Sequence, residues 1–204
     1  HRLAELEKGD SIQAVLGPLG NPTHIEQFGW VVGVGGGIGA APLYPIAQAM
    51  KQAGNRLTII LGARTKELLI MEEEMRAVAD ELILVTDDGS YARKALVTEP
   101  LKELIEARQI DRVWGIGPGI MMKFVALTTQ PYEVKTIVSL NSIMVDGTGM
   151  CGACRVSVGG RTYFACVDGP EFDGHQVDWD LLFSRQRFYL AEEKRALELF
   201  QQAH

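Results

Sequence analysis

The chain of 204 residues, with a mass of 22.4 kDa, is long enough for one large domain or two small ones with a buried core. Its formal net charge of -6 excludes the basic face that nucleic acids and anionic membranes require. Glycine and proline interrupt the long apolar stretches, and residues 1–10 are charged, so we expect neither a membrane span nor a signal peptide. Clustered cysteines without a secretory signal favour a reducing compartment, and we expect a cytoplasmic protein.

The first segment contains one apolar run, residues 11–16, which is followed by two Gly/Pro turns. This pattern predicts a single strand. Because no partner strand follows in the next segment, we expect it to be the end of an upstream sheet and the chain to be part of a longer protein.

Between residues 29 and 140, short β-branched runs alternate with segments of helical pattern. The expected strands are uniformly apolar, as in sheets that are covered on both faces. Strands that alternate with helices of this length predict an α/β fold with a doubly wound parallel sheet. The strands are expected at residues 30–35, 57–63, 81–86, 112–117 and 134–140, and the helices at 41–54, 66–79, 97–109 and 118–129.

The alternation stops at residue 141. A glycine-rich segment then carries the cysteines, an aspartate-rich turn follows, and the last residues predict one or two helices. We therefore expect a small C-terminal hairpin domain and a terminal helix after the sheet. The expected boundaries are residues 1–22 for the first segment, 23–140 for the sheet domain, 141–180 for the cysteine-bearing domain and 181–204 for the helical segment.

The connection between the first expected strand and its helix, residues 33–42, has five glycines in its first seven residues. A tight turn needs one or two, so this number favours a loop that binds a dinucleotide. Glycines let the pyrophosphate approach the backbone, and the free N–H groups and the positive end of the helix dipole face the anion. The candidate binding residues in this loop are Gly35, Gly36, Gly37, Gly39 and Pro42.

Two further loops follow expected strands, at the edge where ligands bind in open α/β sheets. At the end of the second strand stands Arg64, a basic residue in place of the acid that accepts from the ribose of NAD(H). A basic residue at this position slightly favours NADP(H) over NAD(H), although Arg64 can equally pair with the pyrophosphate or with Glu67. The candidate residues in the two loops are Thr86, Asp87, Asp88, Gly117, Pro118 and Met121.

The three cysteines of the chain, Cys151, Cys154 and Cys166, lie within sixteen residues. Residues 155–164 predict a β-hairpin with a two-glycine turn. In that register Cys154 lies opposite Ala165, so the hairpin returns Cys166 beside the first two thiols. Three thiolates at one place repel one another and need a cation.

A fourth ligand is expected for either zinc or an iron–sulfur cluster, and no cysteine remains for it. Asp146 is the better candidate, because D-x4-C-x2-C-x11-C resembles the plant-type [2Fe–2S] pattern with a carboxylate in place of the first thiolate. His175 is the other candidate. We therefore expect a [2Fe–2S] cluster on Asp146 and the three cysteines, with a structural zinc site or three unconnected buried cysteines as the alternatives.

The pattern G-G-x-G-x-x-P of the glycine loop resembles the ferredoxin reductase superfamily. Together with "DGTGMCGACRV" and "ACVDGPEFDGHQVDWDLL", it resembles the dihydroorotate dehydrogenase electron-transfer subunit family. The Asp-Cys-Cys-Cys set is similar to one branch, the small subunits of NADH-dependent ferredoxin:NADP+ oxidoreductase, also called sulfide dehydrogenase β subunits, whereas the pyrimidine branch uses four cysteines. Ile116 stands where the superfamily has a cysteine near the nicotinamide, so no catalytic thiol is expected.

The resemblance implies an oxidoreductase subunit that passes electrons between NAD(P)H, FAD and a [2Fe–2S] cluster to a larger flavin/iron–sulfur subunit, as a heterodimer, with ferredoxin as a further partner. In this branch the small subunit handles NAD(H). Because family members begin with a flavin-binding β-barrel, residues 1–22 are expected to be its remnant, FAD to belong to the full-length protein, and this chain alone to be inactive. The alternatives are the dihydroorotate dehydrogenase electron-transfer subunit and a non-redox nucleotide-binding module with zinc.

Overall fold

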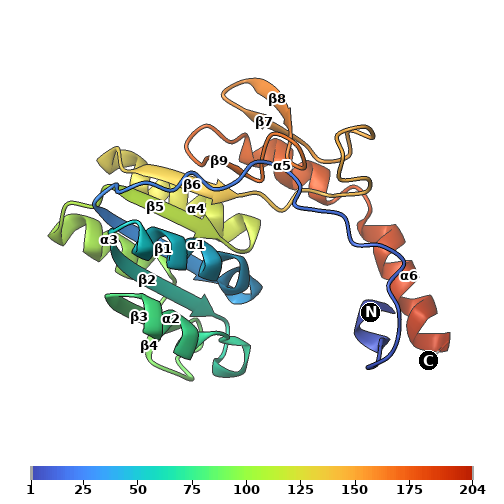
Figure 1. Ribbon diagram of the computed structural model, residues 1–204, viewed down its shortest axis with the longest axis horizontal. Coiled ribbons are helices and arrows are strands. Elements are labelled where there is room, and N and C mark those ends of the chain that lie inside the picture. Colours follow the sequence, from blue (N-terminus) through green and yellow to red (C-terminus); the bar gives the residue numbers. More distant parts are fainter. Residues whose placement is uncertain (1, 204) are drawn as a thin grey trace.

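The computed structural model describes residues 2–203, which are built around a seven-stranded sheet in the order β4-β3-β2-β1-β5-β6-β9 (Figure 1). Neighbouring strands are parallel except β9, which pairs antiparallel with β6. The expected doubly wound parallel sheet is therefore confirmed. The strands of this sheet are β1 (Trp30–Gly36), β2 (Arg56–Ala63), β3 (Glu81–Thr86), β4 (Arg93–Lys94), β5 (Arg112–Ile116), β6 (Lys135–Ser139) and β9 (Glu171–Asp173).

Helices cover both faces of the sheet, because successive side chains of a strand point to opposite faces. On β1, Val31 packs with buried residues of α1 and α2, whereas Val32 and Val34 pack with buried residues of α3 and α4. The helices are α1 (Ala40–Gln52), α2 (Glu72–Val78), α3 (Thr98–Ala107) and α4 (Gly119–Thr129), with the short 3-10 segments η1 (Arg2–Glu5), η2 (Gly37–Gly39), η3 (Lys66–Leu68) and η4 (Gln130–Tyr132).

Apart from β9, which belongs to the sheet, the residues after β6 form a smaller unit beside it. The expected hairpin is confirmed as β7 (Arg155–Val158) and β8 (Arg161–Phe164), and the expected helical end as α5 (Trp179–Gln186) and α6 (Leu190–Ala203). In Figure 1, α6 points away from the sheet.

The strand expected at residues 11–16 is not formed, and this prediction was wrong. The segment is extended and exposed, with Val15 at 84% and Leu16 at 74% of their full accessibility. A strand needs a hydrogen-bonded neighbour, and among the described residues none lies beside this segment.

The helix expected at residues 66–79 is interrupted. Residues 66–68 form η3, Met71 has a left-handed φ of +61°, and only Glu72–Val78 is α-helical. The interruption lets Leu69 and Ile70 pack against the apolar cluster that contains Leu43 and Met75, so burial of these two side chains overrides helix continuity.

Two strands were not expected from the sequence. β4 extends the sheet by two residues beside β3, and β9 forms within the aspartate-rich segment that was expected to be a turn. β9 is held to β6 by pairing such as Ser139 opposite Glu171, and the N–H of Gly174 donates to the carbonyl of Thr136 at 2.8 Å.

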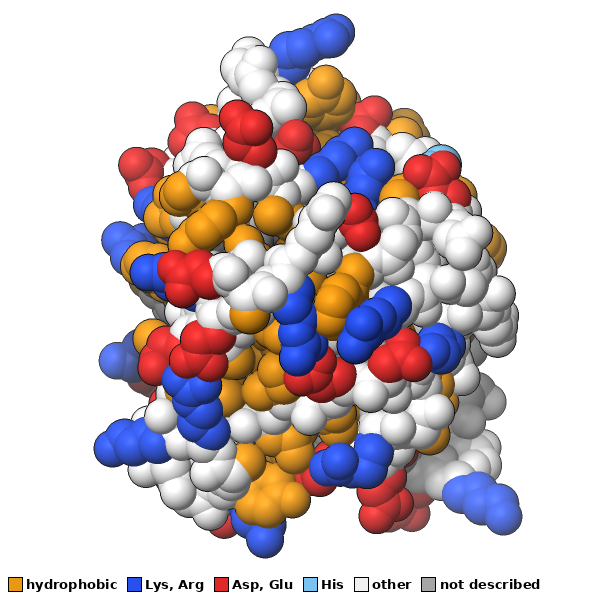
Figure 2. All heavy atoms as spheres, turned by 90° about the vertical axis from the view of Figure 1, so that its left-hand side faces the viewer, with side chains coloured by type: hydrophobic (Ala, Val, Ile, Leu, Met, Phe, Trp, Pro, Cys, Tyr) orange, Lys and Arg blue, Asp and Glu red, His pale blue; other side chains and the backbone are white. Residues whose placement is uncertain are grey.

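The face where the strands begin, on the left in Figure 1, carries charges of both signs between apolar side chains (Figure 2). The guanidinium carbons of Arg56 and Arg108 lie 3.8 and 4.9 Å from the ring centroid of Trp30, and Arg108 pairs with Glu81 at 2.6 Å. Such mixed charge is typical of a solvated face. No helix in residues 2–203 has the length and apolar character that a membrane span needs.

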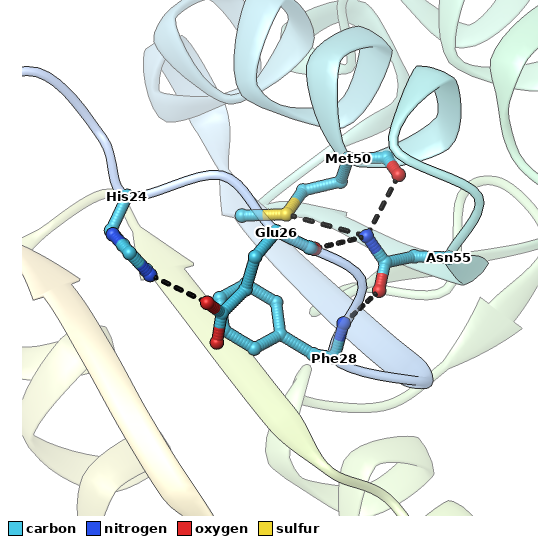
Figure 3. Close-up of polar contacts among 5 residues, drawn as sticks. All are labelled: His24, Glu26, Phe28, Met50 and Asn55. Carbon is cyan, nitrogen blue, oxygen red and sulfur yellow. Dashed lines mark hydrogen bonds and ion pairs between the residues drawn. The ribbon is translucent and has the colours of Figure 1, made fainter.

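Asn55, between α1 and β2, joins the entry of β1 to the exit of α1 (Figure 3). Its side-chain oxygen accepts from the N–H groups of Phe28 at 2.7 Å and Gly29 at 3.1 Å, and its amide donates to the carbonyls of Glu26 at 2.8 Å and Met50 at 2.9 Å. Asn55 is 2% exposed, so water does not replace these partners.

Asn55→Ala removes the side chain that bonds to these four backbone groups, of which the carbonyl of Met50 keeps the N–H of residue 55 as a donor. We expect the free energy of unfolding to fall by about 2–3 kcal/mol, since an unpaired buried polar group costs about 1–3 kcal/mol. Urea unfolding followed by circular dichroism measures this. Gln52→Ala, on the exposed surface of α1, is the control and should change stability by less than about 0.5 kcal/mol. Equal stability of the two variants would contradict this role of Asn55.

Candidate functional site

The glycine loop joins β1 to α1 through η2 at the carboxyl edge of the sheet. The carboxyl ends of β1 and β5 lie side by side at this edge, and the strand order runs in opposite directions from these two strands. This is the position where ligands bind in open α/β sheets. On the other side of β1 lies a small hollow, too narrow to admit a water molecule, which is lined by Gly35, Gly37, Ala40, Leu61, Gly62, Leu68, Leu69 and Ile70.

The glycines of this loop are needed for different physical reasons. A side chain at Gly39 would overlap with the carbonyl of Ile116, and a side chain at Gly36 would overlap with the sulfur of Met121. Both therefore permit close packing against the loop after β5. Gly37 has a φ of +52°, and a Cβ placed on it has no protein atom within 4 Å. Gly37 thus faces open space, where an anion can approach the backbone.

The loop after β5 lies against the glycine loop. A Cβ on Gly117 would lie 3.0 Å from the carbonyl oxygen of Gly36, and one on Gly36 would lie 3.1 Å from Cδ of Pro118. The structure therefore brings the first and third expected loops together, with Met121 between them. Pro42 follows in the first turn of α1.

Several polar groups of the loop after β3 form hydrogen bonds within the loop. The hydroxyl of buried Thr86 donates to the carbonyl of Tyr91 at 2.7 Å and accepts from its N–H at 3.2 Å. Asp88 accepts from the hydroxyl and the N–H of Ser90, which lower the pKa of this carboxyl. Asp87 is exposed. The cofactor contacts expected for these three residues stay predictions.

Arg64 is exposed at the end of β2. Within residues 2–203 its guanidinium forms no ion pair, so the pairing with Glu67 that the sequence left open is not formed. The pKa of Glu67 is lowered chiefly by a hydrogen bond from Thr65. Arg64 keeps its donors for a bound anion.

The hairpin forms in the expected register, with Arg155 opposite Phe164, and the N–H of Ala165 donates to the carbonyl of Cys154 at 3.2 Å. The sulfurs of Cys154 and Cys166 are 3.2 Å apart, and the two residues are 2% and 7% exposed. Burial, and then the neighbouring Cys154 thiol, raise the pKa of Cys166. The two thiols therefore form a preassembled pair.

The other two expected donors lie apart from this pair. Cys151 is exposed, and among residues 2–203 no group of three His, Cys, Asp or Glu side chains surrounds one point. The carboxylate of Asp146 accepts from the N–H and hydroxyl of Thr148, at 2.8 and 2.5 Å, which lower its pKa. His175, the alternative ligand, bonds to Thr129 at 2.8 Å.

The donor chemistry of this segment fits an iron–sulfur cluster. Three sulfurs are available, and backbone N–H groups face two of them: that of Ala153 lies 3.5 Å from the sulfur of Cys151, and that of Gly149 lowers the pKa of Cys166. N–H groups that point at sulfur stabilise its negative charge, as in cluster sites. Cys151, Cys154 and Cys166 would hold the metal through their sulfurs.

Helix α4 connects the two regions. Met121 lies against Gly36 in the glycine loop, while the next residue, Met122, is buried in the same apolar cluster as Cys154 and Cys166. The first helical residue, Gly119, has no room for a side chain because the ring of Phe183 on α5 lies 2.8 Å from its Cβ position.

Sequence reasoning missed this contact between α4 and α5, because it joins segments about sixty residues apart with no local pattern. Sequence reasoning also missed Ser142, which follows β6. Its hydroxyl is buried and has no hydrogen-bond partner, and no other buried side-chain oxygen or nitrogen in residues 2–203 lacks one. A buried polar atom without a partner retains capacity for a ligand.

Two families match the chain. Residues 34–126, which include the glycine loop, match a family described as the oxidoreductase NAD-binding domain. Residues 141–178, which include the three cysteines, match the iron–sulfur cluster binding domain of dihydroorotate dehydrogenase B.

Known relatives match nearly the whole chain. A Thermotoga maritima protein described as a homolog of the dihydroorotate dehydrogenase B (NAD(+)) electron transfer subunit is 54% identical over 98% of this chain and 71% of its own length. A Methanocaldococcus jannaschii protein, described as a probable subunit of this kind, is 37% identical over 91% of this chain and 70% of its own length.

A solved structure of an NADH-dependent reduced ferredoxin-NADP oxidoreductase, reported in a work on flavin-based electron bifurcation, superposes with a TM-score of 0.91. It is 52% identical, and the match covers 98% of this chain and 72% of that one. The chain thus belongs to the family of dihydroorotate dehydrogenase B electron transfer subunits and their homologues, and it is an oxidoreductase-type electron-transfer subunit with an NAD-binding domain and an iron–sulfur cluster binding domain.

Proposed function

We propose that this chain is the small subunit of a ferredoxin:NADP+ oxidoreductase, which exchanges electrons with NAD(H) and passes them through a [2Fe–2S] cluster to a larger flavin/iron–sulfur subunit. The observation that carries this proposal is the position of α4, whose first turn contacts the glycine loop through Met121 and whose Met122 is buried in one apolar cluster with the thiol pair. Cofactors on two sides of one helix suit electron transfer within a single rigid unit. The similarity to the ferredoxin-NADP oxidoreductase structure supports this branch.

The nucleotide is proposed to bind at residues 23–140. Gly37 and the N-terminal amides of α1 would hold the pyrophosphate, and Arg64 would add a positive charge at the end of β2. Met121 and Pro118 would wall the side towards β5. We propose NAD(H) as the nucleotide, following the family, against the weak preference for NADP(H) that Arg64 suggests.

The cluster is proposed to bind at residues 141–180, on Asp146, Cys151, Cys154 and Cys166. When bound, it supplies transfer of single electrons. The hairpin brings two of these donors together, and the other two belong to the glycine-rich loop before it. We also propose that FAD is held by the part of the full-length protein outside these 204 residues, so the chain alone does not oxidise NADH.

A second candidate function is that of electron-transfer subunit to a dihydroorotate dehydrogenase, which the names of the relatives favour. The presence of Asp146 in place of a fourth cysteine favours the first candidate. Purification of the native complex separates them, because the co-purifying large subunit either reduces NADP+ or oxidises dihydroorotate.

Gly37→Val tests the nucleotide site. The side chain would project into open space in front of the loop, and its backbone would be strained at positive φ, so we expect the Kd for NADH to rise at least about tenfold. Isothermal titration calorimetry on the 204-residue chain measures this. The control is Gly160→Val in the hairpin turn, which also has a positive φ and no neighbour within 4 Å. Undiminished binding by Gly37→Val would place the nucleotide elsewhere.

Asp146→Cys tests the fourth ligand. A thiolate donates more electron density to ferric iron than a carboxylate does, so the cluster should remain and its reduction potential should fall. Redox titration of anaerobically purified protein measures the potential. Asp88→Cys is the matched control, because Asp88 accepts from Ser90 in the same way as Asp146 accepts from Thr148. An unchanged potential would exclude Asp146, and zinc without iron or sulfide would exclude the cluster.

A further inference from the structure

A short segment before the sheet, residues 19–21, contacts the cysteine-bearing domain (Figure 1). The N–H of Asn21 donates to the carbonyl of Gly169 at 2.7 Å, and its side-chain amide donates to the carbonyl of Asp168 at 2.8 Å. Gly20, with a φ of +75°, lies so close that a side chain would overlap with the carbonyl of Gly169. We call residues 19–21 the bridging segment.

The bridging segment forms hydrogen bonds to the turn that contains Cys166. The N–H groups of Val167 and Asp168 both donate to the carbonyl of Phe164, at 3.0 and 2.7 Å, and the carboxylate of Asp168 accepts from the N–H of Phe164 at 2.7 Å. These bonds make the turn tight. A contact on Asp168 therefore also restrains the position of Cys166.

The other end of the bridging segment contacts the loop that carries the remaining donors. Cδ1 of Leu19 lies 3.2 Å from the Cβ position of Gly147, which directly follows Asp146 and stands four residues before Cys151. The bridging segment thus contacts both halves of the donor set, the loop with Asp146 and the turn with Cys166, although it lies more than a hundred residues away in the chain.

The loop contacts the turn directly at Gly149, whose N–H faces Cys166, and the bridging segment adds a second restraint. The loop has left-handed glycines at 147, 149 and 152, and glycine loses more conformational freedom on ordering than any other residue. We propose that the bridging segment is a positioning element for the iron–sulfur site: it holds the loop carrying Asp146 and Cys151 near the Cys154–Cys166 pair and so slows the loss of iron. This inference rests on the proposed cluster.

Gly20→Ala tests the bridging segment, because the methyl group has no room against Gly169 and the segment must move away. Gly9→Ala is the matched control, in the same N-terminal part of the chain, with a φ of +116° and no neighbour within 4 Å. Asn21→Ala is a milder second variant that keeps the backbone and removes one hydrogen bond.

The measurement is the rate at which a ferrous chelator removes iron from the anaerobically loaded 204-residue chain, at a temperature well below unfolding. We expect about tenfold faster loss from Gly20→Ala, the factor that one or two net hydrogen bonds supply, a smaller increase from Asn21→Ala and none from Gly9→Ala. The electron paramagnetic resonance signal of the reduced cluster should also broaden in Gly20→Ala, while its Kd for NADH should stay unchanged.

Equal rates and signals in Gly20→Ala and Gly9→Ala, with iron present in all variants, would overturn the bridging role and leave the cluster assignment intact. If Gly20→Ala does not fold, the rate for Asn21→Ala decides. Absence of iron and sulfide from the unmodified chain would overturn the cluster assignment, and the bridging role with it.

Discussion

A two-stranded hairpin has marginal stability in water by itself, so the cysteine hairpin β7–β8 depends on the apolar core that it shares with α4. Met122 and Ala126 from α4 are buried in one cluster with Val156 and the two inner cysteines. The adjoining face of the same helix packs through Val125 against the sheet. α4 is therefore apolar on two adjoining faces, and it determines where the hairpin lies relative to the sheet.

The same helix relates the two proposed cofactor sites. Its first turn meets the glycine loop through Met121, and its neighbour Met122 supports the buried thiols. The glycines at 36, 39 and 119 leave room for these approaches, since a Cβ at each would collide with Met121, Ile116 or Phe183. Much of the glycine content at this edge is thus needed for packing between loops, and Gly37 is the position with open space before it.

The four proposed donors for the cluster fall into two pairs with different surroundings. Local strand pairing brings Cys154 and Cys166 together, at a separation of 3.2 Å. Asp146 and Cys151 lie in an exposed loop with glycines at left-handed φ, where nothing in the local pairing brings them to the thiols. Burial of Cys166 raises its pKa and favours the neutral thiol, and a cation bound at the proposed site would reverse that preference.

The parallel sheet and the hairpin register could be predicted from the sequence, because both follow from patterns that are local in the chain. Apolar runs between helices define β1, β2, β3, β5 and β6, and a two-glycine turn sets the pairing of Arg155 with Phe164. The candidate loops followed from the same logic, since the carboxyl ends of parallel strands meet at one edge.

The interruption of the helix at residues 66–79, the antiparallel strand β9 and the contacts of the bridging segment were decided by the tertiary structure alone. In each case a distant partner determines the outcome: an apolar cluster for Leu69, the edge of β6 for Glu171, and the turn at Gly169 for Asn21. Residues 11–16 show the converse, because a strand pattern without such a partner stays extended and exposed. Sequence periodicity indicates which residues tend to be buried or paired, and only the assembled fold supplies the partners with which they pack or pair.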